Sequence, residues 1–378
     1  MSVSQSKLFI DPKLDYPIHD LHLSFAEYIK KCKQIITKGR IELDNESIID
    51  ANTPYELQPP ADKKNKYGAL LVHGLFDSPF VMRDIGHQLC QQGLLVRSIL
   101  LPGHGTVPGA LLGVDYHDWL QAVNYGVATF TNEVEKIFLV GFSTGASLAL
   151  HHAAQHPSIA GVIMISPAVR ILSPFACITN IPPKFSKKWQ RANWFCIRAE
   201  NDFARYQSIP FNAIYQLYLL TQEIRHTGYK QWAKTPIYIA LSEQDEVISS
   251  EANLSIFSHL QNPKNRMLLY SAKKQSNGDA RITLRNSVYP ELGAVNFSHI
   301  TLPITPTNFH YGEQGNYCYA SHTDLNKFIY GAYNRPRIYI DKMLYQFKLI
   351  NKRHRRLTYN PDFEFMASTV KNFIDSLL

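Results

Sequence analysis

Short apolar runs alternate with amphipathic stretches through most of the chain. The runs are rich in aliphatic and β-branched residues and are bounded by turn residues, as buried strands usually are. They occupy residues 68–72, 94–100, 136–140, 161–165, 236–241 and 267–270. The stretches between them carry apolar residues at helical spacing. This alternation predicts βαβ crossovers and a mostly parallel sheet flanked by helices, which is an α/β fold.

Both ends of the chain are predicted to carry amphipathic helices. Residues 23–36 have an apolar stripe, and a helix that opens at Pro361 has a similar apolar face. We therefore predict an N-terminal extension over residues 1–60, with its helix packed on the core. The core itself is assigned to residues 61–169 and 235–378.

The sequence Gly141-Phe142-Ser143-Thr144-Gly145 stands where the apolar run 136–140 meets a stretch of strong helix formers. It therefore occupies a corner between a strand and a helix. At so sharp a corner, a Cβ on either flanking glycine would collide with neighbouring backbone. The corner presents the Ser143 hydroxyl at the carboxyl end of the sheet, where α/β folds bind ligands. This arrangement is typical of the nucleophile elbow of an α/β-hydrolase.

The alternation of strands and helices breaks over residues 170–234, which are rich in aromatic residues. An insertion at this point would cover the active site, so we predict a lid here. Most of its aromatic side chains are expected to form the lid's own core, and some to face an apolar substrate. Its basic residues would attract an anionic headgroup, although a solvated cluster is the simpler interpretation. They are Lys184, Lys187, Lys188 and Arg191.

A serine nucleophile needs a general base within hydrogen-bond reach and a carboxylate that orients the base. In this fold they follow the serine in the order acid, then histidine. Asp245 lies four residues beyond the run 236–241, and Glu243 is the rival acid in the same loop. His299 is the preferred base because it comes after the acid and follows an apolar run. His310 is the next choice.

The negative oxygen of a tetrahedral intermediate needs preorganised N–H donors. Thr144 can supply one from the start of its helix. The second is expected from the loop after the first strand, at Leu75 or Phe76. His73 and His104 precede glycines in tight loops, and we interpret them as structural hydrogen-bonding residues.

Composition and charge limit the class of protein. A chain of 378 residues with 45% hydrophobic residues can bury one large core. No stretch approaches eighteen consecutive apolar residues, and the N-terminus lacks the apolar core of a signal peptide, so we expect a cytoplasmic protein. The five cysteines are scattered without a CxxC pair, which disfavours a disulfide framework or a zinc site.

The net charge of +8 permits weak attraction to an anionic membrane surface. It does not indicate a nucleic-acid partner. The basic run 352–356 is short and has no interleaved aromatic residues, so we interpret it as a solvated loop.

Four motifs in one order resemble the monoglyceride lipase and bacterial carboxylesterase branch of the α/β-hydrolases. They are residues 73–79, 101–105 and 141–145 and the loop that contains Asp245. The resemblance covers about residues 52–170 and 235–305. It implies a triad of Ser143, Asp245 and His299. It also implies oxyanion donors at Leu75 and Thr144, no metal or organic cofactor, and hydrolysis of carboxylic esters through an acyl-enzyme.

The chain departs from the pattern of this branch in three places. Asp245 and His299 are 54 positions apart, more than usual, because residues 273–290 are inserted and are expected to form a loop or hairpin. The N-terminal extension and the segment after the histidine are also additions, and they leave room for a partner or a regulatory role.

The leading functional hypothesis is a serine hydrolase that acts on a small-molecule ester with an apolar acyl group. A monoacylglycerol, a lysophospholipid or a small carboxylic ester would fit. The alternative keeps the triad and changes the acceptor or the bond, which gives an acyltransferase, a thioesterase or a small-peptide hydrolase. A third hypothesis is a ligand-binding receptor on a hydrolase scaffold.

Overall fold

The computed structural model describes most of the chain. It covers residues 7–41, 45–62, 66–170, 190–232, 234–272, 278–292, 294–315, 317, 319–321 and 355–378. Three members of the predicted basic cluster, Lys184, Lys187 and Lys188, lie outside the described residues, as do residues 352–354 of the second basic run, whereas the fourth member, Arg191, lies within them. None of the described helices is both long enough and apolar enough to cross a membrane.

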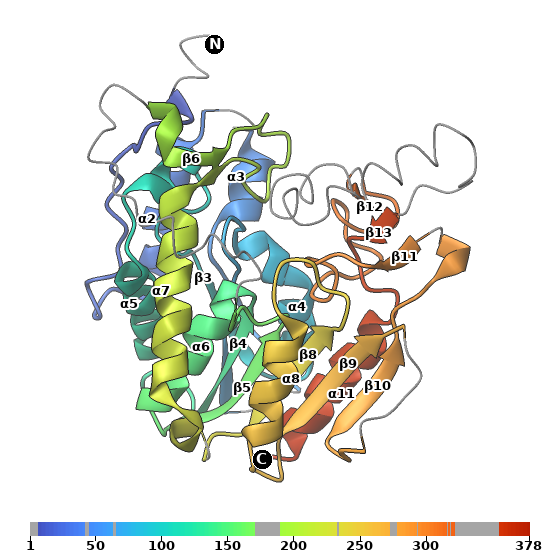
Figure 1. Cartoon of the computed structure of the whole chain (residues 1–378). Coiled ribbons are helices and arrows are strands. Elements are labelled where there is room, and N and C mark those ends of the chain that lie inside the picture. Colours follow the sequence, from blue (N-terminus) through green and yellow to red (C-terminus); the bar gives the residue numbers. More distant parts are fainter. Residues whose placement is uncertain are drawn as a thin grey trace, which may run out of the picture.

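An eight-stranded sheet forms the centre of the molecule, in the order β1-β3-β2-β4-β5-β8-β9-β10 (Figure 1). Every pairing is parallel except that of β1 with β3. The strands are β1 (Tyr55–Leu57), β2 (Tyr67–Val72), β3 (Leu95–Ile99), β4 (Lys136–Phe142), β5 (Ile159–Ile165), β8 (Ile237–Ser242), β9 (Arg266–Ser271) and β10 (Ile282–Asn286). The predicted α/β fold with a mostly parallel sheet is confirmed.

Apolar side chains of the sheet contribute to two cores, one on each face. In β2, Leu70 and Val72 belong to one core, whereas Ala69 and Leu71 belong to the other. Because both faces of the sheet are covered, strands such as β2 and β5 are continuous apolar runs rather than alternating ones.

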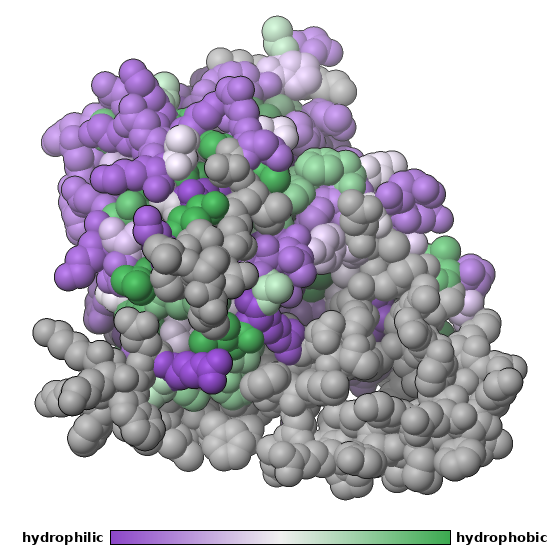
Figure 2. Space-filling view, turned by 90° about the horizontal axis from the view of Figure 1, so that it is seen from above, coloured by the Kyte–Doolittle hydropathy of each residue, from purple (hydrophilic) through white to green (hydrophobic). Residues whose placement is uncertain are grey.

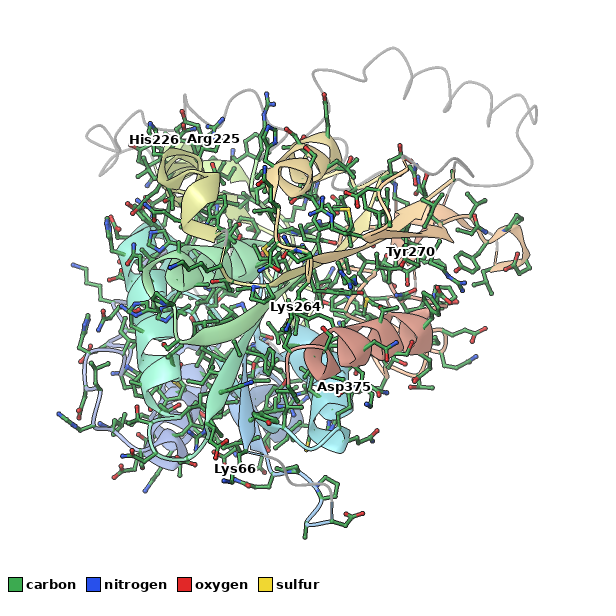
Figure 3. All side chains as sticks on the ribbon, turned by 90° about the horizontal axis from the view of Figure 1, so that it is seen from below. Lys66, Arg225, His226, Lys264, Tyr270 and Asp375 are labelled. Carbon is green, nitrogen blue, oxygen red and sulfur yellow. The ribbon has the colours of Figure 1, made fainter. Side chains whose placement is uncertain are left out.

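Helices cover both faces of the sheet (Figure 1). The first core includes side chains of α2 (Phe25–Gly39), α5 (Tyr116–Ala128), α6 (Thr144–Gln155), α7 (Phe211–Thr227) and α8 (Ser250–His259). The second core includes side chains of α4 (Arg83–Gln91) and α11 (Phe363–Asp375). Figure 3 shows α11 beside α4, with Asp375 at the end of α11. The helix predicted to open at Pro361 corresponds to α11, which starts at Phe363.

The N-terminal segment packs on the first core. Helix α2 starts with a capping box between Ser24 and Glu27, and its residues Tyr28 and Cys32 are fully buried. The Tyr28 hydroxyl donates to the carbonyl oxygen of Leu100 at 3.1 Å. The short helix α3 (Glu46–Asn52) follows. The amphipathic helix predicted for residues 23–36 is confirmed, and the treatment of residues 1–60 as a separate extension stays a prediction.

The described part of the predicted lid contains two different structures. Residues 190–210 form a short 3-10 helix, η5 (Gln190–Asn193), and a two-stranded antiparallel sheet of β6 (Trp194–Cys196) and β7 (Ile209–Pro210). Helix α7 instead packs against α6, and its Leu220 and Ile224 are fully buried in the first core. The lid predicted over residues 170–234 therefore stays a prediction, within which α7 packs on the core. Seen from above, hydrophobic residues lie scattered among hydrophilic ones (Figure 2).

The segments on either side of the predicted base add further strands. Residues 282–286, expected within a loop or hairpin, form β10, which pairs in parallel with β9 because Ile282 and Leu284 pack on the first core. A separate three-stranded sheet has the order β11-β13-β12. Its strands are β11 (Ala294–Phe297), β12 (Tyr319–Ser321) and β13 (Arg355–Leu357). This sheet holds the C-terminal segment next to the loop that carries His299.

Candidate active site

Ser143 lies at the corner between β4 and α6 with φ +54° and ψ −115°. A non-glycine residue with positive φ is strained, and such strain often marks functional sites. The corner needs both glycines, because a Cβ on Gly141 would lie 2.3 Å from the Ala146 nitrogen. A Cβ on Gly145 would lie 2.0 Å from the carbonyl oxygen of Val72. Tight backbone contacts therefore hold the serine in this conformation, for the steric reason inferred from the sequence.

The structure brings Ser143, His299 and Asp245 together in one hydrogen-bonded chain. The distance from His299 Nε2 to Ser143 Oγ is 2.8 Å, and that from His299 Nδ1 to Asp245 Oδ2 is 2.7 Å. All three residues are buried. They follow the carboxyl ends of β4, β8 and β11. The geometry suits a neutral His299 that donates from Nδ1 and accepts the serine proton at Nε2.

The loop around Asp245 fixes the orientation of its carboxylate. Asp245 Oδ1 accepts hydrogen bonds from the N–H groups of Val247 at 2.8 Å and Ile248 at 3.1 Å. The other oxygen is then directed at His299. Glu243, the rival acid, is instead the acceptor of a hydrogen bond from Ser271.

The alternative base His310 lies in a different cluster. Its Nε2 is 2.8 Å from Asp202 Oδ1, and the neighbouring Tyr311 hydroxyl donates to Asp202 Oδ2 at 2.8 Å. Because Asp202 belongs to the inserted segment, His310 joins the segment after β11 to that insertion. His299 is the histidine that the structure places against Ser143.

The loop after β2 is held by two buried histidines. His104 Nε2 accepts the N–H of Phe76 at 3.1 Å, and His73 Nε2 accepts the N–H of Leu101 at 3.1 Å. Burial lowers the pKa of His104 to about 4 and that of His73 well below its usual value, so both rings stay neutral acceptors. Both histidines therefore occupy structural positions.

These hydrogen bonds separate the two expected oxyanion donors. The N–H of Phe76 is engaged by His104. By contrast, the N–H groups of Leu75 and Thr144 donate to no other group among the residues that the structure describes. The positions of Leu75 and Thr144 as donors stay a prediction that this pattern supports.

Burial and neighbouring charges act in opposite directions on His299. Burial is the largest single effect and lowers its pKa, but the charge and hydrogen bond of Asp245 together with the charges of Glu246 and Asp77 outweigh it. The net result is a pKa of His299 above its usual value. A histidine whose cation is stabilised in this way can hold the proton taken from Ser143.

Two charged residues near the site were not singled out from the sequence. The Asp77 carboxylate lies beside Gly74, where an ideal Cβ would be 2.5 Å from Asp77 Oδ2 and 3.1 Å from the Ser143 Cβ. Arg205 of the insertion places its Nε 3.6 Å from Asp77 Oδ1. Asp77 stands within the motif of residues 73–79, which was the available signal. Arg205 has no such motif.

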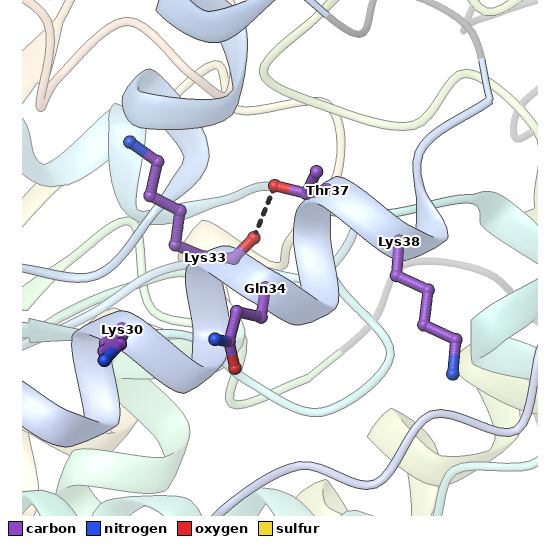
Figure 4. A pocket seen from close by; sticks show the side chains of 5 residues that line it. All are labelled: Lys30, Lys33, Gln34, Thr37 and Lys38. Carbon is purple, nitrogen blue, oxygen red and sulfur yellow. Dashed lines mark hydrogen bonds between the residues drawn. The ribbon is translucent and has the colours of Figure 1, made fainter.

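No group of three or more His, Cys, Asp or Glu side chains gathers as metal ligands within the described ranges. A hollow on the outer surface of α2 contains none of the predicted site residues (Figure 4). It is lined by Lys30, Lys33, Gln34, Thr37 and Lys38. Lys33 is partly neutralised there, because its Nζ lies 2.5 Å from Asp50 Oδ1.

The central part of the chain matches the sequence model of a known protein family. The sequence model of the family described as "Serine aminopeptidase, S33" matches residues 63–273, more than half of the chain. The chain belongs to the serine aminopeptidase S33 family. The matched region of this S33 protein includes β2 to β9, with Ser143 and Asp245, and ends before His299. The resemblance to α/β-hydrolase serine hydrolases is thereby confirmed.

A curated relative of this S33 protein is the thermostable monoacylglycerol lipase of Bacillus sp. (strain H-257). The two are 36% identical over 113 residues, which are 30% of this chain and 45% of the lipase. The match thus spans less than half the length of that relative.

Several solved structures are similar to this S33 protein. One is of the metagenome-derived lipolytic enzymes LipS and LipT, at 22% identity, 57% coverage of this chain and 86% of the other, and a TM-score of 0.49. Another is the Paleococcus ferrophilus monoacylglycerol lipase, at 16% identity, with 58% coverage of this chain, 88% coverage of the other and a TM-score of 0.46. A soluble variant of the Saccharomyces cerevisiae monoglyceride lipase is 15% identical, with 58% coverage of this chain, 82% coverage of the other chain and a TM-score of 0.47. With TM-scores below 0.5, the fold assignment rests on the strand order of the chain itself.

Proposed function

We propose that this protein is a serine hydrolase that cleaves carboxylic esters with an apolar acyl group through an acyl-enzyme. The observation that carries the proposal is the buried chain of hydrogen bonds from Ser143 Oγ through His299 to Asp245, with Ser143 on a strained corner. In this proposal Ser143 is the nucleophile, His299 the general base and Asp245 the orienting acid.

The first half of the reaction forms the acyl-enzyme. Ser143 Oγ attacks the ester carbonyl while its proton passes to His299 Nε2. The N–H groups of Leu75 and Thr144 stabilise the negative oxygen of the tetrahedral intermediate. When the intermediate collapses, the bond to the leaving alcohol breaks and the alcohol takes the proton from His299.

The second half of the reaction releases the acid. Water attacks the acyl-enzyme and gives its proton to His299 Nε2. The bond between Ser143 Oγ and the acyl carbon then breaks, and the serine recovers its proton. Throughout, Asp245 stabilises the positive charge that His299 carries in each intermediate.

Aromatic side chains beside the insertion support an apolar acyl group. The ring of Phe203, in the insertion, lies 5.1 Å from that of Phe80 and 5.9 Å from that of Phe309. Phe309 is 71% exposed, so this group forms an apolar edge on the surface. Phe203 is two residues from Arg205, which contacts Asp77 beside the serine. The relative named as a monoacylglycerol lipase also supports an ester substrate.

Amide hydrolysis is the second candidate, because the matching family is described by aminopeptidase activity. The same triad serves both bonds, so the fold does not choose between them. The assay must therefore offer both kinds of substrate.

The test is turnover of 4-nitrophenyl esters from acetate to palmitate and of aminoacyl 4-nitroanilides, by wild type and Ser143→Ala. We expect ester turnover with a chain-length optimum and a loss of at least about 10³-fold in Ser143→Ala. Ser368→Ala, a substitution of an exposed serine in α11, is the matched control and should retain full activity. Ester turnover that survives in Ser143→Ala would refute the assignment of the nucleophile, and exclusive anilide turnover would favour the second candidate.

A further inference from the structure

A second carboxylate lies next to the proposed triad. Glu246 Oε1 accepts the main-chain N–H of His299 at 3.2 Å. Its other oxygen, Oε2, accepts a hydrogen bond from Arg356 Nη1. Arg356 Nη1 also lies 3.3 Å from the carbonyl oxygen of Gln244, in the same loop as Asp245. The guanidinium therefore bridges the acid loop and strand β13.

Strand β13 also holds the backbone on both sides of His299. The N–H of Ser298 donates to the carbonyl oxygen of Leu357 at 3.0 Å, and the Thr301 hydroxyl donates to the same oxygen. Strand β11, which leads into the loop, pairs in parallel with β13, with Phe297 opposite Leu357. The C-terminal segment thus helps to fix the position of the histidine loop.

The charges of this arrangement balance only as a set. The side chains of Glu246 and Arg356 are 11% and 13% exposed. Without Arg356, two adjacent carboxylates would face one imidazole in a buried site, and an unpaired buried charge is costly. Without Glu246, the guanidinium would be an unpaired cation close to His299 and would oppose the imidazolium that forms during catalysis.

We propose that Glu246 and Arg356 form a charge-compensated pair that positions His299 and sets the pH range over which it acts as a base. The inference rests on the proposed function, in which His299 is the base for Ser143. Both residues act through His299 and are positioning residues. Strand β13 of the C-terminal segment is then part of the catalytic unit.

The electrostatic surroundings of His299 agree with this role. Burial raises the pKa of Glu246, Arg356 lowers it and Asp245 raises it, with a net rise. Glu246 in turn raises the pKa of His299. The charged and titratable groups around this pair and the imidazole are Asp77, Arg205, Asp245, Glu246, His299 and Arg356.

The test measures the protonation of His299 and requires no ester or amide substrate. A fluorophosphonate labels Ser143 when the serine oxygen displaces fluoride from phosphorus and its proton passes to His299. The pH dependence of the labelling rate therefore reports the apparent pKa of His299. It is measured for wild type, Glu246→Gln, and the double variant Glu246→Gln with Arg356→Gln. Glutamine keeps an oxygen for the His299 N–H at position 246 and an amide donor at position 356.

Glu246→Gln is expected to move the acid limb of the profile to lower pH by about 0.5 to 1 pH unit, because one negative charge a few ångströms away is lost and Arg356 is left unpaired. The double variant removes both charges and should move the limb back toward wild type. The matched control is Arg285→Gln. Arg285 pairs with Asp362 at 2.7 Å and is 40% exposed, so its profile should not move.

A purely structural role predicts lower labelling rates with an unmoved acid limb, and that result would overturn the inference. An acid limb in the double variant identical to that of Glu246→Gln would overturn the part assigned to Arg356. If the double variant does not fold, the single variant Glu246→Gln still shows whether the charge of Glu246 moves the acid limb. Normal labelling of wild type without any ester turnover would overturn the proposed ester hydrolase and leave the inference about His299 intact.

Discussion

Asp77 is a buried carboxylate whose ionisation the folded structure opposes. The residue is 3% exposed, and its Oδ1 has no hydrogen-bond partner among the described residues. The Arg205 Nε at 3.6 Å offers only a long ion pair. Replacement of Asp77 by asparagine keeps the shape of the side chain and removes its charge. We expect this change to stabilise the folded protein at alkaline pH.

The magnitude follows from the pKa. Burial raises the pKa of Asp77 from 3.8 to about 6, against the opposing effects of Arg205 and His299. Because the pKa is higher in the folded than in the unfolded state, the contribution of the protonated Asp77 carboxyl to the free energy of unfolding is fully present below about pH 4. This stability is lost as the pH rises through the folded-state pKa of about 6. The ionised carboxylate then costs the folded state about 3 kcal/mol at pH 8 and about half of that at pH 5. Asparagine also leaves Arg205 without its ion pair, so 3 kcal/mol is an upper value.

The assay is the free energy of unfolding from urea titrations of wild type and Asp77→Asn at pH 5 and pH 8. The gain from the substitution should be larger at pH 8. The control is Asp279→Asn, because hydrogen bonds from Arg281 lower the pKa of Asp279. Its charge contributes stability above its unfolded pKa, and that stability is lost as the pH falls. Asp279→Asn should therefore have a small effect of the opposite sign at pH 8. A lower stability of Asp77→Asn at pH 8, or an equal effect of the substitution at both pH values, would refute this origin of the pH dependence.

Two further predictions concern stability. Gly145→Ala should lower the free energy of unfolding by at least about 3 kcal/mol or prevent folding, because its Cβ would lie 2.0 Å from the Val72 carbonyl oxygen. Gly228→Ala, at φ +74° with nothing within 4 Å of its Cβ, should cost only about 1 kcal/mol; equal losses in the two variants would contradict the steric explanation. Arg40→Met removes hydrogen bonds to the carbonyl oxygens of Gly105 at 3.0 Å and Phe203 at 2.6 Å. It should cost about 2–4 kcal/mol in thermal or urea unfolding, against less than about 0.5 for the exposed Lys38→Met.

Local interactions made much of the fold predictable from the sequence. The apolar runs were recognisable as buried strands because helices cover both faces of the sheet, so most residues in a run are apolar. The elbow around Ser143 was recognisable because a strand, two glycines and a helix are consecutive in the chain. Their steric requirement is local, since Gly141 and Gly145 pack against the elbow itself and the neighbouring strand.

Other features depend on contacts between distant parts of the chain. His299 and His310 both follow Asp245, and their chemistry is the same, so only the folded structure places one against Ser143 and the other against Asp202. Helix α7 was expected in a lid, and its apolar face alone does not show that it packs against α6.

The sequence by itself therefore determined the α/β class, the strand-to-helix corner and the chain order of serine, acid and histidine. The tertiary structure decided which charges meet. Glu246 and Arg356 are 110 positions apart, and Asp77 contacts Arg205 from a different loop. Neither pair leaves a local pattern, because a charged residue in a loop has the same sequence signature whether it is solvated or buried. Burial is what makes each pair necessary, and burial is a property of the folded chain.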